Sequence, residues 1–319
     1  MKFKAFLTDN GIIQLEKRFI PALEKMGKTC HIFLTPDHFF ILHNLLSPTS
    51  PQSIAQFNAP SLFDDYRISS QFDNVIAFSI DLFLLLRALR SSSSISTTNP
   101  NPNPNRLQVK LVKKLPPNST TPLPFLTFES KGYKSAVIQD IPISKPLSRS
   151  SLVELQDALN SANEIPKTLV QVPDLGQLQN YVDRLKNVGE LLNVTIGKCG
   201  DLYLQVSTSL ITVGAEFRRL TVLGERASRG VGEDRDLSAQ TRARRAIERG
   251  EAESVEVSLK HFGKSLQYHL AKPDCTFYGV GMNGGCLTVI FQFFLPGSRQ
   301  TNKSISLHCR LPVLDPGAS

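Results

Sequence analysis

The pattern of apolar and polar positions predicts short strands alternating with helices that have a single apolar face. A strand at Phe3–Leu7 comes first, and a helix follows the break at Asp9-Asn10-Gly11. Apolar residues recur in this helix at steps of three and four, the spacing of one helical stripe, at Ile12, Leu15, Phe19, Leu23 and Met26. Two strands then flank a Pro36-Asp37 turn. The order strand, helix, strand, strand is thus the first unit of the chain.

The second half of the chain repeats this unit. A strand, a helix and two strands follow again from Thr168, with the apolar residues in matching places. In one ungapped frame, Met26, Ile32, Leu34, Phe40 and Leu42 fall on Val188, Val194, Ile196, Leu202 and Leu204. The segments that begin at Ile76 and Val255 match each other in a similar way. We therefore expect an α+β fold of two similar domains, each built from two strand-helix-strand-strand-strand units.

The limits of the repeats predict an N-terminal domain at residues 1–143, a connector at 144–166 and a C-terminal domain at 167–319. Within the connector, the spacing of Leu152, Leu155 and Leu159 predicts a short helix.

Two segments have the composition of unpacked chain. Residues 91–105 carry no charge and one aliphatic residue, and residues 224–253 are rich in charged and small residues but poor in large apolar ones. Such segments cannot bury enough apolar surface to offset the entropy of ordering, so we expect a disordered loop and a disordered insertion.

Charge narrows the range of partners. The chain has 36 Lys and Arg against 28 Asp and Glu, a net charge of +8, which favours a polyanionic partner, nucleic acid ahead of an anionic membrane surface. The free faces of four predicted helices carry cations at Lys17, Arg18, Lys25, Lys28, Arg87, Arg90, Arg184, Lys186, Lys260, Lys264 and Lys272. Any one of these is consistent with an ordinary solvated helix face. Their recurrence on four helices in equivalent positions favours a surface that contacts phosphates without reading sequence.

No cofactor or metal site is expected. The five cysteines include no C-x-x-C pair and the six histidines have no ligand spacing. Gly279-Val-Gly281-Met-Asn-Gly284 fits the dinucleotide pattern, but a strand, not a helix, follows it, and Asn283-Gly284 is a hairpin signal. Asp64-Asp65 lacks the partner carboxylates of a metal-dependent nuclease. Short apolar stretches and the lack of a signal-peptide core predict a chain of the nucleus or cytosol. We expect no enzymatic activity.

Several segments resemble one known family. These are MKFKAFLTDNG at the start, KTCHIFLTPDHF, the IPI of Ile141–Ile143, VTIGKCGDLYLQVSTSLITVGAEF and VEVSLKHFGKSLQYHL. In this order, from Met1 to about Phe294, they resemble the Hus-one subunits of the nine-one-one checkpoint clamp. The insertion at 224–253 departs from the compact pattern of clamps.

The resemblance implies a sliding-clamp fold similar to that of proliferating cell nuclear antigen, with basic helices on the inner face of a DNA-encircling ring. It implies a non-catalytic subunit of a heterotrimer with two related clamp subunits, loaded at DNA damage by a checkpoint clamp loader. It further implies checkpoint signalling, recruitment of DNA repair enzymes, contact with double-stranded DNA without sequence specificity, and a nuclear location with a cytoplasmic pool.

Neighbouring subunits would join along two edge strands. By resemblance, the interface residues are Ala136, Val137, Ile138 and Ile141 in the last strand of the first domain, and Leu210, Ile211, Val213 and Ala215 in the second. Two alternatives stay open from the residues alone: a homotrimeric replication clamp and a monomeric, non-specific nucleic-acid-binding module.

Overall fold

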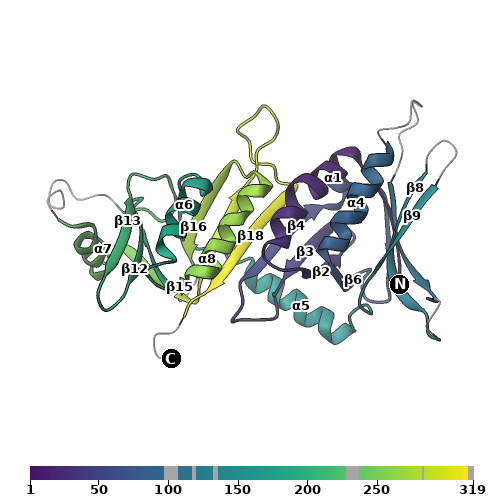
Figure 1. Ribbon diagram of the computed structural model, residues 1–319, viewed down its shortest axis with the longest axis horizontal. Coiled ribbons are helices and arrows are strands. Elements are labelled where there is room, and N and C mark those ends of the chain that lie inside the picture. Colours follow the sequence, from purple (N-terminus) through teal and green to yellow (C-terminus); the bar gives the residue numbers. More distant parts are fainter. Residues whose placement is uncertain (97–106, 117–119, 132–135, 228–236, 282–283, 315–319) are drawn as a thin grey trace.

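The computed structural model describes residues 1–96, 107–116, 120–131, 136–227, 237–281 and 284–314. The molecule is elongated, and its helices α1, α4, α6 and α8 lie in front of the central strands in the view of Figure 1. Antiparallel strands form three sheets behind and beside these helices. The predicted α+β class is therefore confirmed.

The first unit runs from β1 (Lys2–Leu7) through a broken helix to β2 (Thr29–Leu34), β3 (His38–His43) and β4 (Gln52–Asn58). The helix consists of α1 (Asp9–Gln14), the π-helical turn η1 (Leu15–Phe19) and α2 (Ile20–Glu24). Thr8 caps α1, because its hydroxyl accepts a hydrogen bond from the Gly11 N–H at 2.9 Å. Pro21 sits in the first turn of α2, where its missing N–H costs nothing in a new helix. The predicted apolar stripe is buried as expected.

The second unit follows a short link of α3 (Ala59–Leu62) and β5 (Phe63–Ser69). It consists of β6 (Ile76–Asp81), α4 (Leu82–Ser96), β7 (Leu107–Lys114), β8 (Leu123–Lys131) and β9 (Ala136–Pro142).

The connector contains the predicted helix, α5 (Arg149–Ala162). Leu152, Leu155 and Leu159 are buried in a separate apolar cluster with Phe33 and Phe40 of the central sheet. The leucine spacing therefore identified both the helix and its buried side.

The second half repeats the order of the first. Its third unit is β10 (Thr168–Gln171), α6 (Leu175–Leu185), β11 (Leu191–Gly197), β12 (Leu202–Ser207) and β13 (Thr212–Phe217). After β14 (Val222–Gly224) and α7 (Ala239–Glu248), the fourth unit is β15 (Ala252–Ser258), α8 (Leu259–Leu266), the 3-10 turn η2 (Gln267–Ala271), β16 (Cys275–Val280), β17 (Cys286–Gln292) and β18 (Ile305–Pro312). The duplicated strand-helix-strand-strand-strand pattern is confirmed.

One sheet runs through both halves. Its order is β14-β10-β16-β17-β18-β4-β3-β2-β6, and the junction is the antiparallel pair β18–β4, in which Leu307 lies opposite Ala55. Two smaller sheets flank it, β5-β1-β7-β8-β9 in the first half and β13-β12-β11-β15 in the second. The flanking sheets leave β9 and β13 as edge strands near opposite ends of the molecule (Figure 1).

Arg18 adds a second link between the halves. Its Nε and one terminal nitrogen donate to the carbonyls of Ala271 and Lys272, both at 3.0 Å. The guanidinium also lies over the rings of Phe19 and Phe293, 5.8 and 5.4 Å from their centroids. The planar, multi-donor guanidinium suits this bridging position, where a lysine could not make the same set of contacts.

The first predicted disordered segment is partly helical. Helix α4 continues to Ser96, so the loop expected at 91–105 is wrong for its first residues, while 97–105 lie outside the described residues. The Ser92 hydroxyl is buried, donates to the Ala88 carbonyl at 2.8 Å and accepts from the Gln139 amide at 3.1 Å. The serine-rich composition predicted a loop. The prediction failed because Gln139 of β9, distant in the sequence, hydrogen-bonds to Ser92.

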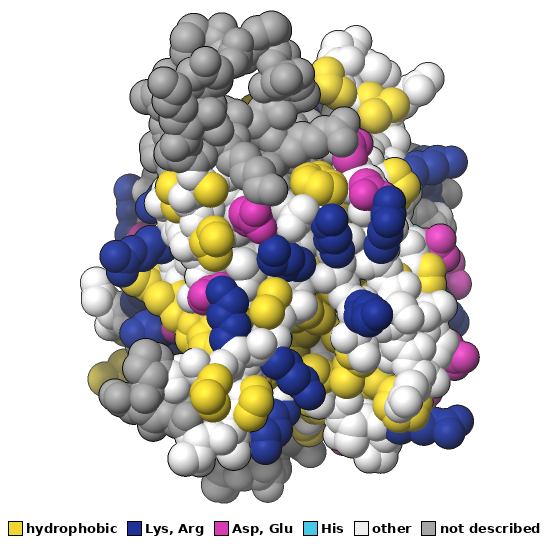
Figure 2. Space-filling model, turned by 90° about the vertical axis from the view of Figure 1, so that its right-hand side faces the viewer, with side chains coloured by type: hydrophobic (Ala, Val, Ile, Leu, Met, Phe, Trp, Pro, Cys, Tyr) yellow, Lys and Arg dark blue, Asp and Glu magenta, His cyan; other side chains and the backbone are white. Residues whose placement is uncertain are grey.

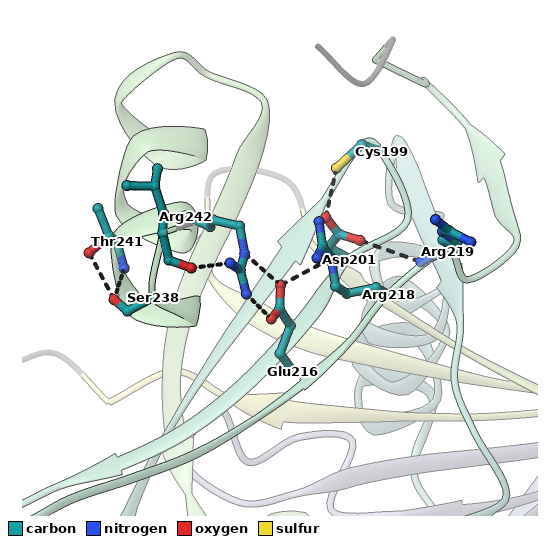
Figure 3. Close-up of polar contacts among 9 residues, drawn as sticks. Cys199, Asp201, Glu216, Arg218, Arg219, Ser238, Thr241 and Arg242 are labelled. Atoms are coloured by element: carbon teal, nitrogen blue, oxygen red, sulfur yellow. Dashed lines mark hydrogen bonds and ion pairs between the residues drawn. The ribbon is translucent and has the colours of Figure 1, made fainter. Parts of the chain in front are cut away.

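The second predicted disordered segment contains a docked helix. Within 224–253, α7 packs against β15 and β11, whereas 228–236 lie outside the described residues. Arg242 of α7 forms an ion pair with Glu216 of β13, its Nε 3.0 Å from the carboxylate, and each side chain is only 12% exposed (Figure 3). Arg218 approaches the same carboxylate at 3.4 Å (Figure 3). The composition of this segment predicted disorder because the segment has no apolar stripe to bury. An ion pair holds α7 in place instead.

We expect Arg242→Met to loosen α7. The change leaves the Glu216 carboxylate without its main partner in a largely buried place, which should lower the free energy of unfolding by about 2 kcal/mol. Hydrogen exchange of residues 239–248 and urea unfolding measure the effect. Arg244→Met is the matched control because its side chain is 73% exposed on the same helix. Equal protection in both variants would contradict the role of the ion pair.

We expect Arg18→Met to weaken the junction between the halves. Two backbone carbonyls lose their charged donor, at a cost of about 1–3 kcal/mol in the free energy of unfolding. Chemical denaturation checks this against Lys17→Met, an exposed neighbour in the same turn. A loss no larger than that of Lys17→Met would show that Arg18 does not couple the halves.

Candidate nucleic-acid interface

The helices of both halves form one continuous layer. Helix α2 contacts α4, α6 contacts α8, and α2 and η1 contact η2 across the junction between the halves. Each helix buries one stripe in the common core, for example Leu85 and Leu89 of α4 or Leu178 and Val182 of α6. Because every buried stripe faces the sheets, the opposite faces of the helices together form one surface.

The structure brings most of the predicted cations to the solvent side of this layer. Exposed side chains are Lys17, Lys25, Lys28, Arg87, Arg90, Arg184, Lys186, Lys260 and Lys272, and Lys264 is half-buried. Lys186 forms an ion pair with the exposed Asp183 at 2.5 Å. Exposed pairs of this kind contribute little to stability and exchange readily, so Lys186 stays available to an anion.

Arg18 differs from the rest of the predicted set. Its Nε and one terminal nitrogen donate to the carbonyls of Ala271 and Lys272, so it also joins the halves. Burial lowers the pKa of Arg18, and the nearby Asp274 partly offsets this. The sequence placed Arg18 correctly on the helix but gave no sign of a partner some 250 residues away.

A hollow between α6 and α8 concentrates positive charge. It has a volume of about 550 Å³, and its charged lining residues are Lys186, Lys260, Lys264 and the single carboxylate Glu190, beside Gln179 and Gln267. Burial lowers the pKa of the neighbouring His261, and the charges of Lys264 and Lys260 lower it further. Three ammonium groups outnumber the one carboxylate around the hollow, so its net charge favours a phosphate group.

Cations also occur on the end of the molecule formed by β8 and β9, but there they are mixed with acidic and apolar side chains (Figure 2). Lys110 pairs with Glu129 at 2.8 Å, Lys114 with Asp140 at 2.6 Å, and Arg67 with Asp65 at 2.7 Å. We favour the helix layer for polyanion binding, because its exposed cations come from both halves, whereas these three pairs all belong to the first half.

The two predicted interface strands have open edges. Just before β13, Thr208 N–H donates to the Ile211 carbonyl at 2.8 Å, and just after β9, Ile143 N–H donates to the Pro124 carbonyl at 3.3 Å. Since bonding direction alternates along antiparallel strands, the backbone groups of Thr212, Gly214, Ala136 and Ile138 point away from their own sheets.

The predicted interface residues divide into two groups. Leu210, Ile211 and Ile138 are 91, 57 and 56% exposed, and Ala136 is also exposed. Val137, Val213 and Ala215 are half-buried and Ile141 is buried, and the backbone groups of these four bond within their own sheets. A neighbouring chain could therefore reach the first group directly and the second only through the strand edge.

The described residues of the glycine-rich motif lie at the end of one strand, β16, and between it and the next strand, β17. Gly281 N–H donates to the Cys286 carbonyl at 2.8 Å, joining β16 to β17 as a hairpin, so a strand follows as predicted. In the described ranges no group of three or more His, Cys, Asp and Glu side chains is arranged to hold a metal ion. No helix among those residues is both long and apolar enough to cross a bilayer.

One side chain of the helix layer was not singled out from the sequence. Phe83 is 54% exposed on α4, one turn before Arg87. Its spacing of four from Arg87 was a readable signal, because residues four apart share a helical face. A phenylalanine within an apolar run is normally assigned to the core, so the sequence alone did not distinguish Phe83 from its buried neighbours.

Comparisons with known proteins agree on one family. The sequence model described as Hus1-like protein matches residues 1–299. The chain is 26% identical over 223 residues to "Checkpoint protein HUS1" of Homo sapiens, covering 69% of this chain and 74% of that protein. It is 25% identical over 277 residues to "Checkpoint protein hus1 homolog" of Dictyostelium discoideum, covering 86 and 88%.

A solved structure supports the fold. The proliferating cellular nuclear antigen of Entamoeba histolytica superimposes with a TM-score of 0.57 at 8% identity, covering 98% of this chain and 99% of that one. At this identity the likeness concerns the fold alone, and it confirms the predicted sliding-clamp architecture.

Proposed function

The chain belongs to the Hus1-like protein family, and from this we propose that it is a non-catalytic subunit of a DNA-encircling checkpoint clamp. The observation that carries the proposal is the helix layer, whose exposed cations come from both halves and face one side. Phosphates are the only part of duplex DNA that such a surface can contact at every position, so binding would be independent of sequence.

The open strands β9 and β13 supply the means of closing a ring. Each has an outer edge with which no other described strand pairs, and strand addition by a neighbouring subunit would satisfy its backbone N–H and C=O groups. Exposed Leu210, Ile211 and Ile138 next to these edges would add apolar contact to the ladder. Two edges near opposite ends of one subunit fit head-to-tail contacts, which generate closed rings when the rotation closes.

We further propose that the ring is a heterotrimer with two related clamp subunits, loaded at DNA damage by a checkpoint clamp loader. In this role the protein would act in the nucleus, support checkpoint signalling and hold DNA repair enzymes on DNA. The family names of the relatives support the checkpoint role. The clamp would work by topology: DNA passes through the ring, and weak phosphate contacts let the ring slide.

Charge reversal at Lys25, Arg87 and Lys264 together should weaken binding of the assembled ring to DNA. Each phosphate contact that is lost should reduce the magnitude of the negative slope of log K against log salt by about 0.9. Binding titrations at several salt concentrations measure this. Charge reversal at Lys2, Lys4 and Arg67 on β1 and β5 is the matched control, because these exposed cations lie outside the helix layer. An unchanged salt slope in the first variant would remove the helix layer from the proposal.

Leu210→Asp should impair assembly with the neighbouring subunit while leaving the fold intact. The side chain is 91% exposed, so the change costs the isolated chain little, but an interface would have to bury the new carboxylate. Co-purification with the partner subunits measures assembly, and Ile165→Asp, at a 68% exposed position of the connector, is the control. Normal assembly of the Leu210 variant would argue against β13 as the contact.

Light scattering of the isolated chain separates the alternatives. A heterotrimer subunit should not form a stable trimer by itself, whereas a homotrimeric replication clamp should. A monomeric, non-specific nucleic-acid-binding module would hold linear DNA by itself, whereas a clamp would slide off the ends of linear DNA.

A further inference from the structure

Phe83 is an exception among the aromatic side chains. In the part of the chain that the structure describes, every other Phe and Tyr is buried or half-buried, while the Phe83 ring is 54% exposed. It does not lie at a loop or chain end but in the first turn of α4, on the helix layer that carries the exposed cations. Burying an exposed ring against a ligand would remove its apolar surface from water, which is favourable.

The ring lies on the cationic face of α4. Leu82, Leu85, Leu86 and Leu89 are buried on one side of the helix. At 100° per residue, Phe83, Arg87 and Arg90 cluster on the opposite side. With a rise of 1.5 Å per residue, Arg87 lies about 6 Å and Arg90 about 10 Å further along the helix axis.

A cation also flanks the ring on the other side. The Leu82 N–H donates to the Lys28 carbonyl at 2.8 Å, which holds Lys28 beside the start of α4. The Lys28 side chain is exposed. The exposed residue Lys28 therefore adjoins the start of α4, and Arg87 and Arg90 follow the ring along the helix.

A flat ring between cations fits a nucleobase between phosphates. Bases stack on aromatic rings whatever their identity, while flanking Lys and Arg hold the backbone. In a duplex both faces of every base are already stacked, so only an unpaired base can offer its face to the ring. An acidic peptide would satisfy the cations but would leave the flat face of the ring without a specific partner.

We propose that Phe83, with Lys28 and Arg87, forms a stacking site for an unpaired base of single-stranded DNA. This inference rests on the proposed function, because it assumes that the helix layer faces DNA. It adds a preference that phosphate contacts cannot supply. The helix layer of the first half would bind single-stranded DNA through base stacking, an interaction that duplex DNA cannot make. In the second half, the described exposed residues of α6 and α8 include no aromatic or aliphatic side chain, so the site belongs to one half only.

The test compares two DNAs of equal length, a labelled thymidine oligonucleotide and a duplex, bound to the full chain at low salt. Phe83→Ala should weaken binding to the single strand about tenfold and change duplex binding less than about twofold. The chain contains no tryptophan, so Phe83→Trp introduces a sole indole. Its fluorescence should be quenched by the single strand and not by the duplex, while affinity is retained.

Ile13→Ala is the matched control, since Ile13 is an aliphatic side chain, 49% exposed, on the neighbouring helix α1. It should leave binding of both DNAs unchanged. The proposal is overturned if Phe83→Ala weakens both DNAs equally or neither, or if the Phe83→Trp indole is not quenched by the single strand. Charge reversal at Lys25, Arg87 and Lys264 must weaken both DNAs; if it does not, the proposed function itself fails, whatever Phe83 does.

Discussion

The antiparallel ladder between β18 and β4 is the contact on which the rest of the structure depends. It joins the last strand of the chain to a strand of the first unit and so makes one sheet from two repeats. Buried backbone groups must be paired, and this ladder pairs them where the repeats would otherwise meet as separate edges. It also fixes the helices of both halves in one layer, because each helix packs by its apolar stripe on a shared core.

The same constraint leaves two edges unpaired. With the central sheet complete, β9 and β13 end the flanking sheets, and no other described strand pairs with their outer edges. Between these open edges lies the cationic helix layer, held across its middle by Arg18. A subunit of a ring needs free strand edges at both ends to join its neighbours and a continuous helix layer between those edges.

Helix α7 in the insertion shows that a segment without a buried apolar side can still pack on a sheet. Helix α7 has no buried apolar residue, yet it lies on the outer face of the second-half sheet, where Tyr203 and Thr195 are buried beneath it. Burial raises the pKa of the Tyr203 hydroxyl, and the nearby carboxylates of Asp201 and Glu216 raise it further. The Arg242–Glu216 pair therefore stabilises α7 and the edge strand β13 together, which places the insertion close to the proposed site of assembly.

The sequence by itself determined the duplicated units, the apolar stripes, the connector helix and the basic helix faces, since each depends on spacing within a short segment. The tertiary structure decided that Arg18 links the two halves, because it bonds to carbonyls near residue 271. It decided that α4 continues through its serines and that α7 is ordered, because Gln139 and Glu216 supply partners from distant strands. It also decided which residues of β9 and β13 turn their backbone outward. Periodicity records what a segment buries, whereas hydrogen bonds and ion pairs between distant segments leave no period in the sequence.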